Sequence, residues 1–327
     1  MSEHADPFGI LQRLAGDPRP SAAEEQAALT RLEQAIAAER RPRHRRIRWM
    51  IPAVAAAVLV VVAGLAVVSR PGAAAAALGD ISQAARRAGP LDVPSGSFLY
   101  RESEAVDLVV RPGSDLGVDR EHVVYLLPTR RREWRRPDKR FFQLATTAST
   151  PIFFDQATKR AYEAHDGPTL DRVGEVVVER FTDVADPIVE TDWPTVPDDL
   201  EAAMSATLAE GGDTRPLEVQ LFDLAADLLR DATDPQLRAA VLQVLATLPV
   251  DLVDRRDDGT IVIALDDPGP PAAREMLTIA ADGTLLAEST TWLDADPVIG
   301  IPANTVISHT TYRPAQIVDQ LPELPNR

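Results

Sequence analysis

The sequence contains no cysteine and few aromatic residues. The absence of cysteine from all 327 residues excludes disulfide bonds, thiolate zinc sites and cysteine nucleophiles. Aromatic residues make up 5% of the chain although 45% of it is hydrophobic, so a core has to be built mainly from alanine, valine and leucine. The chain also lacks a Gly-x-Ser-x-Gly elbow, a Walker-type phosphate loop and a Gly-x-Gly-x-x-Gly dinucleotide fingerprint.

Histidines and carboxylates form no recognisable active-site motif. No histidine stands at the spacing of a metal-binding pair such as His-Glu-x-x-His, and acidic pairs such as Asp257-Asp258 fall in predicted turns. We therefore expect no catalytic residue, no cofactor and no metal site, and predict that the protein is not an enzyme. The catalytic alternative is an envelope hydrolase whose carboxylate pair is brought together by folding. The histidines are His4, His44, His122, His165 and His309.

Charge is distributed unevenly along the chain, whose net charge is −16 with histidine neutral. Residues 1–48 contain nine arginines and seven acidic residues, a net charge of about +2. Residues 71–327 contain 43 acidic and 24 basic residues, a net charge of −19. An acidic segment of this size disfavours nucleic acid or anionic lipid as its partner.

A long uncharged segment follows the basic N-terminal part. From Met50 to Ser69 twenty residues carry no charge and are mostly alanine, valine and leucine, and a helix of that length rises about 30 Å, enough to cross a hydrocarbon core. Trp49 stands where an interfacial aromatic is expected, and Pro52 falls in the first turn, where its missing N–H costs little. We predict a transmembrane helix over residues 49–70. A buried core helix and a cleaved signal peptide are the alternatives.

Arginines are concentrated on one side of this predicted span. Six stand just before it and only Arg70 stands just after it. The positive-inside rule then places the N-terminus in the cytoplasm and residues 71–327 outside. We interpret the cluster as a topology determinant next to anionic headgroups, where each arginine contributes on the order of 1 kcal/mol. A DNA-binding arm is the alternative, and we predict no nucleic-acid partner. The topology determinants are Arg40, Arg41, Arg43, Arg45, Arg46, Arg48 and Trp49.

Residues 1–48 are predicted to be a cytoplasmic helical segment. The stretch PSAAEEQAALTRLEQAIAAERR begins with serine and glutamate at capping-box spacing and continues with good helix formers. Leu29, Leu32 and Ile36 share one face of this helix at spacings of three and four residues. We interpret this stripe as a contact for a sigma factor or another cytoplasmic protein. A plain helical stem leading into the membrane is the alternative.

The remaining sequence alternates between helical and strand patterns. Residues 71–95 are predicted to be a juxtamembrane helix and linker, and residues 96–327 an extracytoplasmic domain. Strand-like runs rich in β-branched and aromatic residues precede and follow a helical block at about 198–248. Asp-Gly dipeptides at 258–259 and 282–283 each separate apolar runs and predict hairpins. Strands, helices and again strands, without βαβ alternation, indicate an α+β fold with an antiparallel sheet.

A second basic run, TRRREWRRPDKRFF, interleaves arginine and lysine with aromatic residues, which is typical of a nucleic-acid surface. With the predicted topology this run meets no nucleic acid in the cell interior. We interpret it as the exposed faces of two strands around a Pro137-Asp138 turn, with its charges facing the acidic remainder of the domain. A contact site for an anionic envelope ligand is the functional alternative.

Three C-terminal segments carry a resemblance to a known family: DPQLRAAVLQVLATLPVDLVDRRDDGTIVIAL, REMLTIAADGTLLAESTTWL and NTVISHTTYRPAQIVDQLP. Their Leu-Pro after a helix, strand pair, hairpin and closing strand around a tyrosine resemble a family of actinobacterial single-pass membrane proteins of unknown biochemical function. The resemblance also covers the N-terminal helix, the arginines and the span. Genes of that family commonly lie beside one for an extracytoplasmic-function sigma factor. The resemblance implies an anti-sigma-like or sensor role, with a cytoplasmic end that holds a sigma factor.

Taken together, these patterns predict a single-pass protein of the cell (plasma) membrane with a cytoplasmic N-terminus and an extracytoplasmic C-terminal domain. We expect a sensor or regulator whose outer domain binds an envelope ligand. The alternative is a membrane-tethered lipid or lipoprotein carrier with an inert cytoplasmic stem, because a sheet around a helix is similar in architecture to the half-barrel of lipoprotein carriers and sigma-E regulators.

Overall fold

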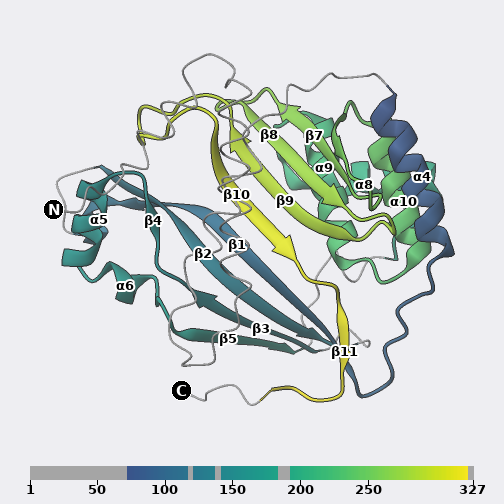
Figure 1. Cartoon of the computed structure of the whole chain (residues 1–327), viewed down its shortest axis with the longest axis horizontal. Helices are drawn as coiled ribbons and strands as arrows, with labels where there is room; N and C mark the ends of the chain where they lie inside the picture. Colours follow the sequence, from purple (N-terminus) through teal and green to yellow (C-terminus); the bar gives the residue numbers. More distant parts are fainter. Residues whose placement is uncertain (1–71, 117–120, 137–140, 183–191, 323–327) are drawn as a thin grey trace. The chain divides into compact units, whose positions relative to one another are not determined.

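An antiparallel sheet organises the part of the chain that the computed structural model describes, residues 72–116, 121–136, 141–182 and 192–322. Helices before and between the strands complete a mixed α+β arrangement (Figure 1), which confirms the predicted fold class at this level. None of the helices within these ranges is long and apolar enough to span a bilayer. Several predictions lie outside the described residues: the cytoplasmic stripe Leu29, Leu32 and Ile36, the arginines at positions 40–48, Trp49 and the span over 49–70.

The sheet has the strand order β5-β3-β2-β1-β10-β9-β8-β7-β6, and every strand pair in it is antiparallel. Two short strands, β4 (Ile152–Phe153) and β11 (Gln316–Val318), add to β2 and β1 respectively. The bounds of the other strands, in sheet order, are β5 (Val176–Thr182), β3 (Phe141–Ala148), β2 (His122–Arg135), β1 (Phe98–Pro112), β10 (Thr305–Tyr312), β9 (Leu285–Trp292), β8 (Ala273–Ile279), β7 (Ile261–Asp267) and β6 (Asp251–Arg255).

Strand β1 joins the two halves of the sheet. On one side it pairs with β2 along its length, and on the other side it pairs with β10, so that Ala105 lies between Thr129 and Thr310. Because β10 follows β1 by about two hundred residues, this pairing unites the strands before the helical block with those after it. The hairpins β6–β7 and β8–β9 turn at Asp258-Gly259 and Asp282-Gly283, which confirms both Asp-Gly predictions.

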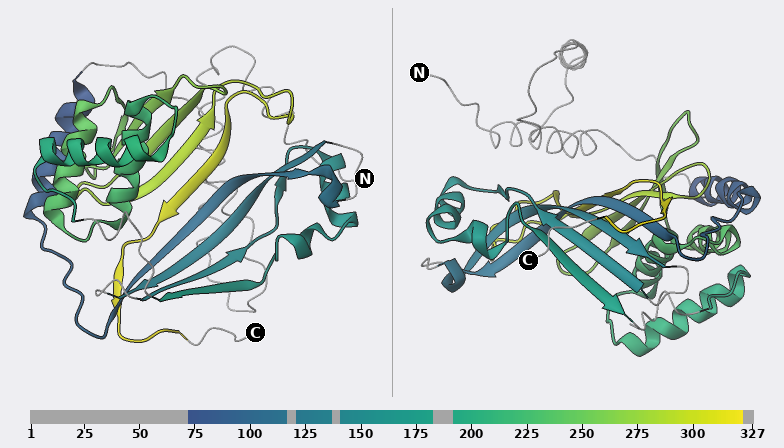
Figure 2. Two further views of the ribbon diagram at one scale, coloured as in Figure 1. Left: turned by 180° about the vertical axis from the view of Figure 1, so that it is seen from behind. Right: turned by 90° about the horizontal axis from the view of Figure 1, so that it is seen from below.

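The predicted helical block is confirmed as three consecutive helices, and a further helix precedes the sheet. Asp234 caps the last helix of the block by accepting a hydrogen bond from the backbone N–H of Gln236, and Pro235 is its first residue. Seen from behind, the block covers the β7–β9 part of one sheet face (Figure 2), and we call this side the helix face. The helices are α4 (Ala73–Arg87), α5 (Gln156–Ala164), α6 (Gly167–Leu170), α8 (Pro197–Gly211), α9 (Leu217–Asp231) and α10 (Pro235–Thr247), with a 3-10 turn η1 at Gly113–Leu116.

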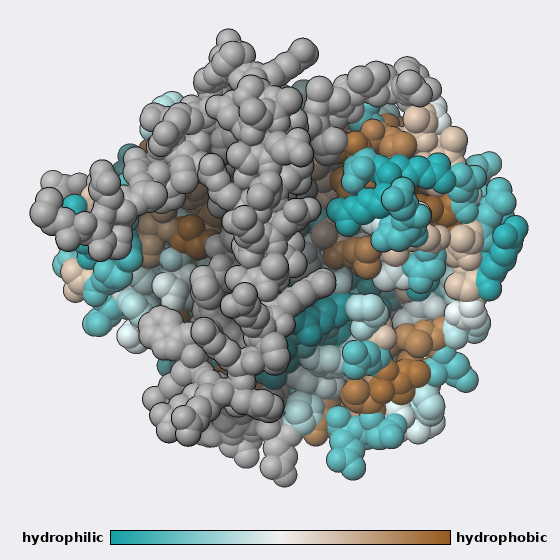
Figure 3. Space-filling model, viewed as in Figure 1, coloured by the Kyte–Doolittle hydropathy of each residue, from teal (hydrophilic) through white to brown (hydrophobic). Residues whose placement is uncertain are grey.

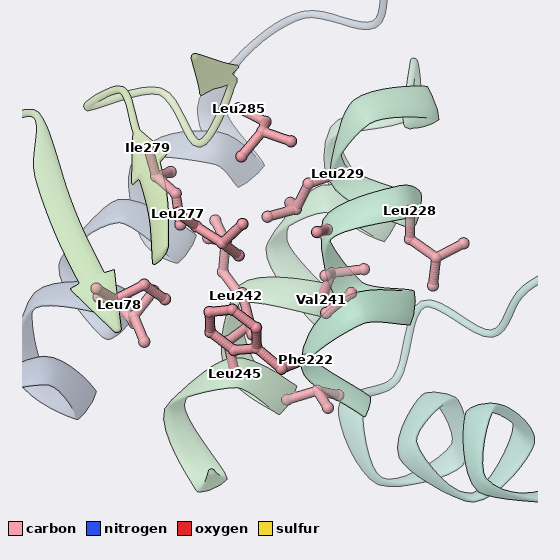
Figure 4. Packing of buried hydrophobic residues seen from close by; sticks show 14 of the residues in the cluster. Leu78, Phe222, Leu228, Leu229, Val241, Leu242, Leu245, Leu277, Ile279 and Leu285 are labelled. Carbon is pink, nitrogen blue, oxygen red and sulfur yellow. The ribbon is translucent and has the colours of Figure 1, made fainter. Parts of the chain in front are cut away.

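The main core lies between these helices and the sheet. Helix α10 is its centre: Val241, Leu242 and Leu245 are fully buried and meet side chains from α4, α9 and β8 (Figure 4). Helix α4 contributes Leu78, so part of the segment predicted as a juxtamembrane helix and linker, 71–95, packs into the same core as the strands. As the composition required, leucine, valine and alanine dominate, and Phe222 and Trp193 are the aromatic members of the cluster.

A second, smaller core fixes α5 and α6 to the far end of β1 and β2. Tyr125 and Tyr162 are buried there and both donate their hydroxyls to Asp171 Oδ2, at 2.7 and 2.8 Å. Arg111 binds the other oxygen of the Asp171 carboxylate. The carboxylate is thus fully hydrogen-bonded, as a buried charge must be, and we assign this cluster a structural role.

Truncation of a core leucine tests the central position of α10. We expect Leu242→Ala to lower the free energy of unfolding by about 2–5 kcal/mol, because it leaves a cavity among fully buried side chains. The matched control is Leu217→Ala at the start of α9, where the side chain is 47% exposed and the change should be within about 0.5 kcal/mol. Urea unfolding followed by circular dichroism measures both, and equal losses would contradict this account of the core.

Candidate functional site

Strand β2 carries charged side chains on both faces of the sheet. Side chains along a strand point alternately to opposite faces, so the run of arginines at 130–132 cannot form one continuous patch. Arg131 and Arg135 lie on the helix face, with Arg101 of β1. Arg130 and Arg132 lie on the opposite face, which we call the arginine face.

On the helix face the arginines are neutralised by acidic side chains. Arg101 and Arg135 both bind the carboxylate of Asp231 at the end of α9, and Arg135 does so at 3.3 Å. Arg131 binds Asp107 of β1 at 3.1 Å. Arg131 and Arg135 of the second basic run thus face acidic side chains of the domain, and Arg135 helps to tie α9 to the sheet. The predicted Pro137-Asp138 turn lies outside the described residues.

Farther along α9, a carboxylate pair lies at the interface with the sheet. Asp223 of α9 and Glu275 of β8 both meet the Arg215 guanidinium, at 2.9 and 3.9 Å. Burial raises the pKa of Glu275 to about 8, and the hydrogen bond and charge of Asp223 add to this, while Arg215 opposes it. The pair therefore holds a proton near neutral pH.

The same interface contains a second proton-binding group of side chains. Tyr312 of β10 donates a hydrogen bond of 2.5 Å to Glu288 of β9, and Arg230 binds Asp227 at 2.6 Å. Burial is the largest cause of the raised pKa of both Glu288 and Asp227. Asp227 and Glu288, like Glu275, thus have raised pKa values mainly because they are buried.

A small hollow beside this interface does not include the carboxylate pair. It has a volume of about 230 Å³ and lies between α8 and α9, and neither Asp223 nor Glu275 lines it. Ligand pockets usually measure about 300–1,000 Å³. The pair that folding brings together lies at the contact of α9 with the sheet and does not line this hollow. The hollow is lined by Ser205, Leu208, Ala209, Gly212, Asp213, Leu217 and Gln220.

On the arginine face, Glu102 of β1 is the centre of an ion-pair group. Its side chain is 6% exposed and accepts hydrogen bonds from Arg130 at 2.8 Å and Tyr100 at 2.6 Å. Arg313, just after β10, lies 3.1 Å from the same carboxylate and also reaches Glu104. Burial opposes ionisation of Glu102, but the hydrogen bonds from Arg130 and Tyr100 outweigh it and the pKa is lowered. Glu102 is therefore an anion with three donors, two at Oε1 and one at Oε2.

Arg132 is the directly opposed neighbour of Glu102 in the register, yet it does not share that carboxylate. Within the described ranges no ion pair or hydrogen bond joins Arg132 to another residue, and its Nε is buried without a partner. Gln143 of β3 is fully buried on the same face; its Oε1 accepts from Arg180 at 2.7 Å while its Nε2 also lacks a partner. Two unpaired donors thus lie on neighbouring strands of one face.

The arginine face has more positive than negative charge. Along β1, β2, β3, β5 and the residue after β10 it carries four guanidinium groups and two carboxylates, an excess of two positive charges. Figure 3 shows hydrophilic residues on this side where β10 leads into β11. The surplus contrasts with a net charge of −19 for residues 71–327 as a whole. The charged residues are Glu102, Glu104, Arg130, Arg132, Arg180 and Arg313.

The described residues offer no group of three His, Asp or Glu side chains arranged to hold a metal ion. His122, His165 and His309 lie on separate elements, at the start of β2, after α5 and in β10. Comparison of the chain with protein-family models, with curated proteins and with solved structures found no match.

Sequence reasoning did not identify Glu275 or Asp223. It included Arg132 only as part of the second basic run, whose functional alternative is a contact site for an anionic envelope ligand. The spacing of four residues between Asp223, Asp227 and Asp231 could have indicated an acidic stripe on one face of α9. Its partners on β8, β9 and β1 could not be found, because they depend on how distant strands pair. The alternation of side chains along β2 predicts that Arg132 and Arg131 lie on opposite faces. The lack of a partner for Arg132 could not be predicted, because it depends on which residues bind Glu102.

The raised pKa of Glu275 predicts how stability changes with pH. Folding raises this pKa from 4.5 to about 8, so the folded state keeps a proton that the unfolded state releases. The free energy of unfolding should therefore fall as the pH rises from about 5 to about 8, by at most about 1.4 kcal/mol per pH unit for this group. We expect Glu275→Gln, which mimics the protonated form, to flatten this dependence and to be more stable than the unmodified protein above pH 8.

Urea unfolding at several pH values measures this effect. Glu218→Gln in the first turn of α9, where the side chain is exposed, is the matched control and should leave the pH profile unchanged. A profile of Glu275→Gln that parallels the unmodified one would show that the carboxylate pair does not hold the extra proton.

Proposed function

We propose that the chain is a single-pass, membrane-anchored sensor or regulator whose C-terminal domain binds an envelope ligand. The observation that supports a binding role is the arginine face, where Arg132 has no partner among the described residues. Folding alone does not require a half-buried guanidinium without an anion, because such a group costs free energy until it is paired. A surface of this kind is typical of a site completed by a ligand.

The sensor role also depends on the N-terminal part of the sequence. The arginine cluster and the apolar span are the basis for placing residues 1–48 in the cytoplasm and the domain outside the cell membrane. The apolar stripe of Leu29, Leu32 and Ile36 then supplies a contact for a cytoplasmic protein, and the family resemblance favours a sigma factor. In this proposal the ligand acts on the outer domain and the arm carries the response.

A lipid or lipoprotein carrier is the second candidate, since a half-barrel-like sheet with helices on one side suits such a role. A carrier needs an apolar lining for acyl chains. On the helix face, however, β1 and β2 present Arg131, Asp107 and Thr129 beyond the edge of α9, and the hollow between α8 and α9 measures about 230 Å³. These observations favour the sensor over the carrier.

Co-purification of the full chain from membranes tests the proposed function. We expect a sigma factor encoded beside this protein to co-purify with it, and Leu32→Asp to reduce the recovered amount at least about tenfold, because a carboxylate at the centre of an apolar contact loses its hydration. The matched control is Gln34→Asp, which adds the same charge to the opposite side of the predicted helix and should leave recovery unchanged.

Two results would count against the sensor role. One is repeated absence of any sigma factor from the purified full chain. The other is a reporter fusion that locates the C-terminus in the cytoplasm, since the domain could then meet no envelope ligand.

A further inference from the structure

We propose that the arginine face is a binding site for a phosphate-monoester group, with Arg132 as its principal contact. This inference rests on the proposed binding role and adds the chemical class of the ligand. A phosphate monoester carries a charge of about −1.5 to −2 near neutral pH and three strong acceptor oxygens. The arginine face offers a matching surplus of charge and of hydrogen-bond donors.

Arg132 is the donor on which the site depends. Its Nε is buried and has no acceptor, but the Nε atoms of Arg135 and Arg238 are in the same state, so a buried Nε alone does not mark a ligand site. The terminal amino groups of Arg132 are not among the buried atoms, and they also bind no residue within the described ranges. In the row of the sheet that contains Arg132, the neighbour on β3 is Ala145, which has no acceptor in its side chain. An acceptor from outside these residues can therefore bind the terminal groups of Arg132.

The neighbouring arginines each form an ion pair with a carboxylate. Arg130 and Arg313 both reach Glu102, while on the helix face Arg101 and Arg135 share Asp231. Arg132 alone of these five has neither an ion pair nor a hydrogen bond within the described residues. Glu102 does not bind Arg132 in this structure: its Oε1 contacts Arg130 and Arg313, and its Oε2 accepts from the Tyr100 hydroxyl.

The charge surplus of the arginine face is small, which favours a small anion over a polyanion as the ligand. Four guanidinium groups against two carboxylates leave two positive charges, enough for one dianion. The screening length at physiological ionic strength is about 8 Å, so a small ligand responds to the charges around it and not to the whole domain. A long polyanion would extend over the acidic remainder and be repelled. Phosphate suits guanidinium geometry because the two can form paired hydrogen bonds.

Isothermal titration calorimetry on the purified full chain tests the proposal, with inorganic phosphate and glycerol 3-phosphate as the probes. We expect saturable binding of one phosphate group per chain, and no heat with glycerol. Binding of glycerol 3-phosphate but not of inorganic phosphate would assign the site to a phosphorylated organic molecule, and equal binding would assign it to the phosphate group itself. Either result supports the proposal. Absence of binding of both probes in low-salt buffer overturns it.

Two substitutions locate the site. Arg132→Gln removes the charge and should weaken binding at least about tenfold, since a hydrogen bond to a charged group contributes roughly that much. Gln143→Glu adds a carboxylate next to Arg180, which lowers the charge surplus of the arginine face by one, and it should also weaken binding. The matched control, Arg256→Gln at the exposed β6–β7 turn, should leave binding unchanged.

These variants separate failure of this inference from failure of the proposed function. Unchanged phosphate binding in Arg132→Gln, with a folded protein by circular dichroism, would overturn the site. Co-purification of a sigma factor with the full chain does not depend on that result, so a sensor with a ligand of another class would still be supported by it.

Discussion

The close packing of helix α10 between α4 and the sheet is the constraint on which the rest of the domain depends. The Ser82 hydroxyl of α4 donates to the Ala239 carbonyl of α10 at 3.0 Å, a contact that small residues on both helices permit. Gly283 in the β8–β9 turn lies against the same two helices, since a Cβ at this position would be 2.9 Å from Leu242 of α10 and 3.1 Å from Ala85 of α4. Its φ of +83° also favours glycine. Helix α4 and the β8–β9 turn, two distant parts of the chain, thus converge on α10.

The scarcity of aromatic residues explains this style of packing. A core made of alanine, valine and leucine buries little area per residue, so its elements must approach closely to exclude water. Helix α10 does so over most of its surface: its Ala239, Ala240 and Val241 are fully buried, whereas Gln236 and Thr247 near its ends are exposed. The apolar side of helix α9 packs into this core. The adjacent stripe of Asp223, Asp227 and Asp231 faces the strands, where these carboxylates need arginine or protonated carboxyl partners.

Much of the fold could be predicted because its signals are local. The Asp-Gly dipeptides fix the two C-terminal hairpins, and the apolar periodicity over 198–248 fixes the helical block, since turn geometry and helical spacing are properties of short stretches. The pairing of β1 with β10 has no such local signal, and neither has the packing of α4 against α10. The sequence beyond Ala88 continues as a linker, which favoured the prediction of a separate juxtamembrane segment, whereas Leu78 and Ile81 belong to the core.

The candidate site was less predictable because its character depends on which arginines remain unpaired. Long arginine stems can lie along an exposed sheet face and shield it while their charged heads stay in water, so burial alone explains why arginines stand on β2. Lysine would provide a similar stem with a compact, strongly hydrated charge. What the stem does not explain is that Arg132 binds no acidic side chain within the described residues, although Glu102 is directly opposite it in the register. A guanidinium in that position is suited to a planar, bidentate acceptor, and the surplus charge around it favours an anion that the chain itself does not provide.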